Sequence, residues 1–259
     1  MATSNFTVRI EPDIIDGDVS KVIGAQTPSA TDAPFQSGDI LFDWQPIQVP
    51  KGTSKLVSIS GYIMGQDGGV QVNSDIEFVF AKPVSGVAPT TLGEENEPQT
   101  LCFELPKHLI GFAKVEGTSS ATVGGEFGDY FTSNYGGANG GTLPIILQGE
   151  TTGVSVGFDT IYVAAFCGGA VDFSTGVKPT AQATTSTDTI AVDGVDPRKC
   201  FQIGDTVYIH DVDTAIGTVK SMTATNITLN AAIAGGTNIA DEDEFINANP
   251  IRIKLGFSS

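Results

Sequence analysis

The residues best suited to chemistry in this chain lie in the stretch FQIGDTVYIHDVDTAIGTVKSMTATNITLN, residues 201–230. His210 is followed by Asp211 and Asp213, and an imidazole with two carboxylates suits a divalent cation. The two aspartates fall between two expected strands, where Asp side chains commonly hydrogen-bond backbone amides and start a turn. A calcium loop would also need a glycine at its sharp turn and a terminal glutamate, and neither is in place. We therefore expect a turn, with Asp211 and Asp213 as metal-ligand candidates only if another acidic group joins them.

A second acidic run, ADEDEF at residues 240–245, brings four carboxylates together. Their mutual repulsion is relieved by water or by a cation, and acidic side chains are mostly exposed. We expect a solvated turn before the last strands. The alternative is a cation site shared with Asp211 and Asp213, which would suit a metal-dependent enzyme.

Two common catalytic motifs do not occur in the chain. It has no H-E-x-x-H and no G-x-x-x-x-G-K-[ST], the signatures of zinc protease and nucleotide sites. His108 precedes the apolar LIGF and is expected at a strand edge. Cys102, Cys167 and Cys200 form no C-x-x-C pair, which favours small buried thiols over a disulfide framework or zinc site. The sequence therefore predicts a non-enzymatic protein without a cofactor.

Four aromatic residues stand out in the glycine-dense stretch GGEFGDYFTSNYGGANGG, residues 124–141: they are Phe127, Tyr130, Phe131 and Tyr135. Aromatic rings on a loop offer a large contact area at a small cost in side-chain entropy. These four are our candidates for an interaction site, either with a protein or by stacking on a glycan, as in an adhesin. The other interpretation folds the rings inward, where they close one end of a sandwich.

The chain is strongly acidic. It has 30 Asp and Glu residues against 13 Lys and Arg, a formal net charge of -17. That charge repels phosphate backbones and anionic lipid headgroups, so direct nucleic-acid binding and membrane binding are not expected. The first residues lack a basic region followed by an apolar run, and no apolar stretch reaches the length of a membrane span. We expect synthesis in the cytoplasm.

Strand patterns separated by turn residues run through almost the whole chain, among them 40–50, 55–65, 99–106 and 108–117. The 31 glycines agree with a loop-rich β protein. Residues 1–39 are expected to form an N-terminal strand and an extended arm, and residues 40–178 an antiparallel β-sandwich or barrel. A segment rich in Thr, Ser and Ala at 174–188 predicts a linker. Residues 179–259 then carry five short strands, which suggest a small, SH3-like β-barrel. The expected fold class is all-β.

The carboxy-terminal phrases DTIAVDG, FQIGDTVYI, IGTVKSM, NITLN and NPIRIKLGF together resemble a small β module that recurs in structural proteins of tailed bacteriophages. The phrase FDWQPIQVPKGTSKLVSISGYIMGQDGG and the acidic, lysine-poor composition are similar to virion structural proteins of marine phages that infect cyanobacteria. The resemblance implies no catalytic residue. It implies a virion structural protein, either a capsid decoration (cement) protein or a component of the neck or tail. The partners that it implies are the major capsid protein, other virion proteins and further copies of this chain in a homo-oligomer.

Overall fold

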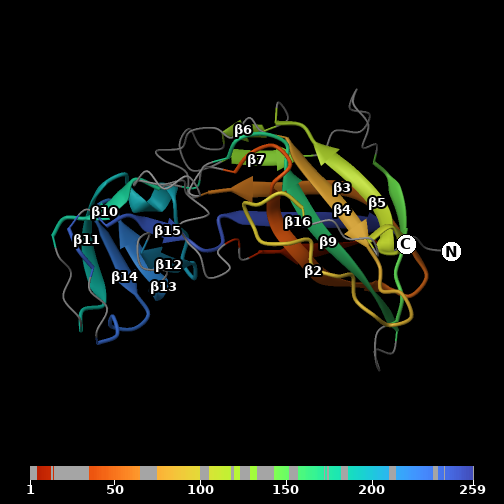
Figure 1. Ribbon diagram of the computed structural model, residues 1–259. Coiled ribbons are helices and arrows are strands. Elements are labelled where there is room, and N and C mark those ends of the chain that lie inside the picture. The colour runs from red at the N-terminus through yellow and green to blue at the C-terminus, as the bar shows by residue number, and fades with distance from the viewer. Residues whose placement is uncertain are drawn as a thin grey trace.

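The computed structural model is all-β, and its sheets are antiparallel. This confirms the fold class expected from the sequence. The structure describes residues 5–12, 14, 35–64, 75–99, 105–117, 120–122, 129–132, 143–151, 157–171, 173, 175–181, 186–209, 214–235, 239–241 and 243–258. These residues form two lobes, a larger β-sandwich and a small barrel (Figure 1). Most of the arm expected at 16–39 and the glycine-dense stretch lie outside the described residues.

Two sheets face each other in the sandwich. The first has the order β1-β16-β3-β7-β6, with β8 also paired to β3; its strands are β1 (Asn5–Ile10), β16 (Ile251–Ser258), β3 (Thr53–Ile63), β7 (Asp129–Thr132), β6 (Ser120–Thr122) and β8 (Ile145–Gln148). The second has the order β2-β9-β4-β5; its strands are β2 (Ile40–Pro50), β9 (Phe158–Cys167), β4 (Ile76–Ala81) and β5 (Leu109–Val115).

Alternation of apolar and polar residues explains why these segments form strands. In β16 the apolar Ile251, Ile253, Leu255 and Phe257 are buried, and the residues between them face outward. Successive side chains of a strand point to opposite faces of its sheet, so one face of β16 enters the core. Phe78 and Phe80 on β4 enter the same core from the opposite sheet. Burial of these large apolar side chains stabilises the sandwich.

The small barrel is one six-stranded sheet that curves until its two edge strands lie close to each other. Its order is β10-β11-β14-β13-β12-β15, and its strands are β10 (Val177–Pro179), β11 (Thr189–Gly194), β14 (Asn226–Leu229), β13 (Thr214–Thr223), β12 (Thr206–Ile209) and β15 (Phe245–Asn247). A short 3-10 helix, η3 (Pro197–Lys199), precedes β12. The hydroxyl group of Thr175, just before β10, donates a hydrogen bond to the Phe245 carbonyl oxygen of β15. This contact ties one end of the sheet to the other and nearly closes the barrel.

The pairing of β16 differs from the expectation. The sequence placed PIRIKLGF in the small barrel, but β16 pairs antiparallel with β1 on one side and β3 on the other. In Figure 1 it runs from the small barrel into the sandwich. The small barrel is therefore inserted between two strands of the sandwich: the chain leaves after Val171 and returns at Ile251. Strand patterns predict a strand but do not identify its partner, which explains the difference.

One helical turn replaces part of an expected strand. The sequence suggested a strand at 99–106, whereas residues Leu105–His108 form the short helix α2. Residues 100–104 lie outside the described part of the chain. Within the described ranges, no helix is long and apolar enough to span a membrane.

A buried hydroxyl group in the sandwich offers a test of its packing. Ser54 on β3 is fully buried, and among the described residues its Oγ finds no hydrogen-bond partner. An unsatisfied buried hydroxyl costs roughly 1 to 3 kcal/mol. We expect Ser54→Ala to raise the free energy of unfolding by about 1 kcal/mol, because the polar group disappears and little volume is lost. Urea denaturation measures the change, and a destabilised variant would contradict this account.

Candidate functional site

The metal-ligand candidates fall in the connection between β12 and β13. Ile209 pairs with Thr214, so residues 210–213 join two adjacent antiparallel strands, as the sequence predicted. Asp211 and Asp213 themselves lie outside the described residues. Among the residues that are described, no three His, Cys, Asp or Glu side chains gather in a geometry that would hold a metal ion.

The acidic run at 240–245 is only partly solvated, in contrast to the expected turn. Asp241 is exposed, but Glu244 is buried. The Glu244 carboxylate accepts a hydrogen bond of 2.8 Å from the backbone amide of Gly176, and the Asp243 carboxylate accepts one of 2.6 Å from Ala240. These carboxylates bind backbone amides of the small barrel, and Glu242 lies outside the described residues. The solvated-turn prediction is wrong for Glu244 because an amide takes the place of water.

The sequence candidates with reactive side chains are buried where they are described. His108 is buried at the end of α2, and its Nδ1 lies 2.9 Å from the carbonyl oxygen of Lys82. Cys167 and Cys200 are buried free thiols, as predicted, and burial raises the pKa of Cys167 far above its usual value. A thiol held in its protonated form is a poor nucleophile. Cys102 lies outside the described residues.

The interaction candidates divide between two parts of the chain. Phe127 and Tyr135 lie outside the described residues. Tyr130 and Phe131 belong to β7, where Tyr130 pairs with Tyr62 and Phe131 with Gly61 of β3. A strand thus interrupts the stretch that the sequence predicted to be a loop.

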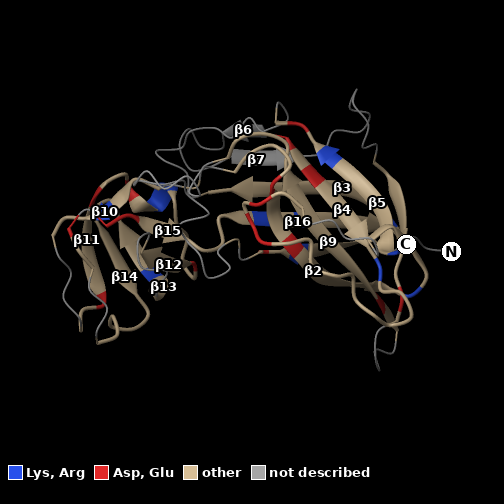
Figure 2. Cartoon of the chain, in the orientation of Figure 1, with Lys and Arg blue, Asp and Glu red and all other residues tan. Residues whose placement is uncertain are grey.

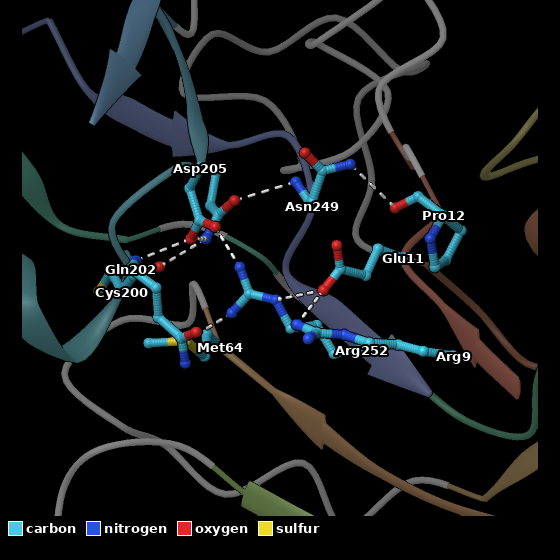
Figure 3. A network of polar contacts seen from close by, with 10 residues as sticks. Arg9, Glu11, Pro12, Met64, Cys200, Gln202, Asp205, Asn249 and Arg252 are labelled. Atoms are coloured by element: carbon cyan, nitrogen blue, oxygen red, sulfur yellow. Dashed lines mark hydrogen bonds and ion pairs between the residues drawn. The ribbon is translucent and has the colours of Figure 1, made fainter. Parts of the chain in front are cut away.

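Arg252 on β16 links the two lobes through polar contacts. Its Nη2 pairs with the Asp205 carboxylate of the small barrel, and its Nε pairs at 3.2 Å with Glu11, just after β1 (Figure 3). Arg9 on β1 pairs with the same Glu11 carboxylate. Only 14% of the Arg252 side chain and 2% of the Asp205 side chain are exposed. We call these four residues, Arg9, Glu11, Asp205 and Arg252, the junction network.

Asp205 is fixed by further hydrogen bonds within the small barrel. Its Oδ2 accepts a hydrogen bond of 2.8 Å from the Gln202 amide and one of 2.7 Å from Asn247 Nδ2. Asn247 Nδ2 also donates to the Cys200 carbonyl at 2.8 Å. Burial nevertheless raises the pKa of Asp205 above its ordinary value of 3.8, against the opposing effects of the Gln202 amide, Arg252 and Asn247. Desolvation of this carboxylate therefore outweighs the attraction of its partners.

Apolar contacts reinforce the same junction. All three residues of β15 are buried, because its two faces point into different cores. Phe245 packs in the core of the small barrel, and Ile246 packs with the core of the sandwich. The two lobes therefore share a strand as well as an ion pair, and both contacts favour one relative orientation of the lobes.

A pocket of about 320 Å³ opens beside the junction network. Residues from three sandwich strands and from the small barrel line it: Arg9, Gly61, Tyr62, Gln202, Arg252 and Lys254. Register places them on one patch, because Lys254 lies opposite Arg9 of β1, and Arg252 lies opposite Tyr62 of β3. Three of the chain's 13 basic residues line this one pocket. Figure 2 shows acidic residues spread over both lobes, so the pocket is a local exception in an acidic protein.

No motif in the sequence marks these residues as a site. A signal was present: Arg252 and Lys254 alternate with buried apolar residues in IRIKL, which puts two cations on one face of a strand.

The sequence matches no known protein family and no curated protein. The function is therefore inferred from the chain's own residues.

Proposed function

We propose that this protein is a non-enzymatic structural component of a tailed-phage particle, and that it binds the outside of the capsid as a decoration (cement) protein. The sequence phrases that resemble phage virion proteins support the proposal. A β-sandwich braced to a small barrel by a shared strand and a buried ion pair also supports it, because such a unit keeps its shape when a neighbouring protein binds.

The observation that best supports protein binding is the set of exposed apolar residues on strand β5. This strand lies at an edge of its sheet, and Leu109 and Phe112 on it are each 42% exposed. Proteins usually protect an edge strand with charged side chains. The lysine of β5, Lys114, is instead paired with Asp75 at 2.6 Å and with Glu77 at 3.6 Å. An apolar edge with its cation neutralised suits burial against another protein.

Substitution of this edge tests the contact. In binding assays with phage particles from which the protein has been stripped, we expect Leu109→Ser combined with Phe112→Ser to weaken binding at least about tenfold, because buried apolar anchors dominate interface energies. The matched control is Ile203→Ser in the small barrel, where Ile203 is 73% exposed. Equal binding by the wild-type protein and the double variant would exclude β5 as the contact.

The particle assignment has its own test, which does not depend on β5. Mass spectrometry of purified particles measures the copy number of the chain relative to the major shell protein. On the order of hundreds of copies indicates capsid decoration, and about a dozen indicates a neck or tail protein, because capsid and neck differ in symmetry. Particles that lack the chain would overturn the proposal.

The N-terminal strand and arm expected at 1–39 are a further candidate contact with a neighbouring subunit, but a simple deletion cannot test them. Strand β1 pairs with β16 along its whole length, and Ile14 and Phe35 belong to the sandwich core. Deleting residues 1–39 would damage the fold itself. Replacing residues 16–33 with a Gly-Ser segment of equal length retains β1, Ile14 and Phe35, and it tests whether the arm binds a neighbouring subunit.

A further inference from the structure

We propose that the pocket beside the junction network is an oxyanion-binding site. Its ligand is a carboxylate or phosphate group held between Arg9 and Lys254, next to Tyr62 and Gln202. The inference is independent of the particle assignment, because it depends only on the charges and positions of the lining residues.

The charges around the pocket are not balanced. Arg9, Arg252 and Lys254 bring three positive charges to the pocket, and Asp205 and Glu11 are the carboxylates paired with them. The Glu11 carboxylate is shared by both arginines. In the part of the chain that the structure describes, Lys254 forms no ion pair. One positive charge in the pocket therefore has no counter-charge among these residues.

The register of the strands brings two of these cations together. Arg9 and Lys254 are direct cross-strand partners, and like charges in that position destabilise a sheet. An anion between the two cations would turn this repulsion into attraction. Two neighbouring cations favour a carboxylate or phosphate group as the ligand, because the negative charge of such a group is shared among several oxygen atoms.

The two arginines differ in how many of their N–H donors are already committed. A guanidinium group has five N–H donors, and the Arg9 group uses Nη2 for Glu11 and is 59% exposed. Arg252 in contrast commits Nε to Glu11, Nη2 to Asp205 and Nη1 to the Met64 sulfur at 3.7 Å (Figure 3). Arg252 thus shapes the inner wall of the pocket, while Arg9 and Lys254 supply donors to the ligand.

The pocket also links binding to the arrangement of the lobes. Gln202 belongs to the small barrel, whereas the other lining residues belong to the sandwich. A ligand in the pocket would contact both lobes, and a ligand that binds only the folded state stabilises it. Binding should therefore raise the thermal unfolding temperature.

Titration with inorganic phosphate at constant ionic strength tests the site. We expect saturable shifts of the backbone amide signals of Gly61, Tyr62 and Gln202 in ¹⁵N NMR spectra. Lys254→Gln and Arg9→Gln should each raise Kd about tenfold, which corresponds to about 1.4 kcal/mol. Lys220→Gln is the matched control, since Lys220 is an exposed lysine on β13 of the small barrel, and it should leave Kd unchanged.

A variant that is expected to bind phosphate more tightly excludes misfolding as the cause of the changes in Kd. Glu11→Gln removes the carboxylate that competes for Arg9, so phosphate should bind several-fold more tightly, in line with one lost competing charge. Shifts that do not saturate, shifts scattered over the surface, or an unchanged Kd in both Lys254→Gln and Glu11→Gln would overturn the proposal.

A second titration identifies the source of the oxyanion. An acetylated peptide amide containing Asp and Glu replaces phosphate under the same conditions. Tighter binding of the peptide assigns the site to carboxylates of a protein partner, and tighter binding of phosphate assigns it to the free ion. Failure of both ligands to bind would exclude the site while leaving the particle assignment intact, because mass spectrometry of particles tests that assignment separately.

Discussion

Arg252→Met is expected to lower the free energy of unfolding by about 3 to 5 kcal/mol, the usual result of removing one partner from a buried ion pair. The variant leaves the Asp205 carboxylate, of which only 2% is exposed, without its cation. The hydrogen bonds from Gln202 and Asn247 remain, so a loss near the lower end of that range is expected. Urea denaturation at neutral pH measures it.

The pH dependence of that loss distinguishes two causes, the unpaired charge of the buried Asp205 carboxylate and the lost packing of the Arg252 side chain. Burial already raises the pKa of Asp205 in the folded protein above its ordinary value of 3.8, and removing Arg252 should raise it further. Above the folded-state pKa the carboxylate is charged and the full penalty applies. As the pH falls through that pKa, the folded state takes up the proton before the unfolded state does, so the penalty shrinks. If Arg252→Met lowered the free energy of unfolding equally at about pH 7 and about pH 4, the loss could not be due to the charge of Asp205.

Arg198→Met provides the matched control for Arg252→Met. Arg198 pairs with Asp196 at 2.6 Å, with hydrogen bonds from both Nε and Nη2. This pair is solvent-exposed, and exposed ion pairs contribute little to stability. We expect no measurable change in the unfolding midpoint of Arg198→Met. A similar loss in both arginine variants would mean that burial does not distinguish the two ion pairs.

Gly194→Ala is expected to destabilise the protein by about 3 kcal/mol. Two causes contribute: the new methyl group clashes with the backbone just before β10, and the backbone conformation of residue 194 is strained for alanine. Gly194 ends β11 with a φ of +73°. A β-carbon there would lie 2.3 Å from the carbonyl oxygen of Gly176. That oxygen also accepts a hydrogen bond of 3.2 Å from the Val195 amide, so a shift of the oxygen would weaken this bond as well.

Gly204→Ala separates the two causes. Gly204 has a φ of +96°, and a β-carbon there would meet no atom within 4 Å. Only the backbone strain applies, and a loss of about 1 kcal/mol is expected. Denaturation of both variants under the same conditions measures the difference. If Gly204→Ala proved as destabilising as Gly194→Ala, strain alone would account for both.

The sequence predicted individual strands well because alternation is a local property. The stretches 40–50, 55–65 and 108–117 match β2, β3 and β5 closely. Long-range pairing is different, since IRIKL carries the same pattern whether it closes the small barrel or joins β1 and β3. Only the folded chain shows that its partners are strands at the other end of the sequence.

The junction network and its pocket lay beyond sequence reasoning for the same reason. Asp205 and Arg252 are 47 residues apart, and Glu11 and Arg252 are 241 residues apart. No motif spacing joins groups at such separations. The acidic residues at 240–245, which do cluster in sequence, bind backbone amides of the small barrel where they are described. Proximity in the chain was therefore a poor guide to where charged groups act together.

The insertion of the small barrel between β9 and β16 has a consequence for the order of folding. The strands of the small barrel occupy one continuous stretch, from Val177 to Asn247, so short loops close its contacts. The sandwich must instead wait for β16, which the ribosome makes after the small barrel and which β1 and β3 both require. During synthesis we expect the small barrel to form first, while β1 and the edge of β3 away from β7 and β8 stay exposed to incorrect pairing. The slow step in the maturation of this protein is then the arrival of β16, because contacts across so long a chain form slowly.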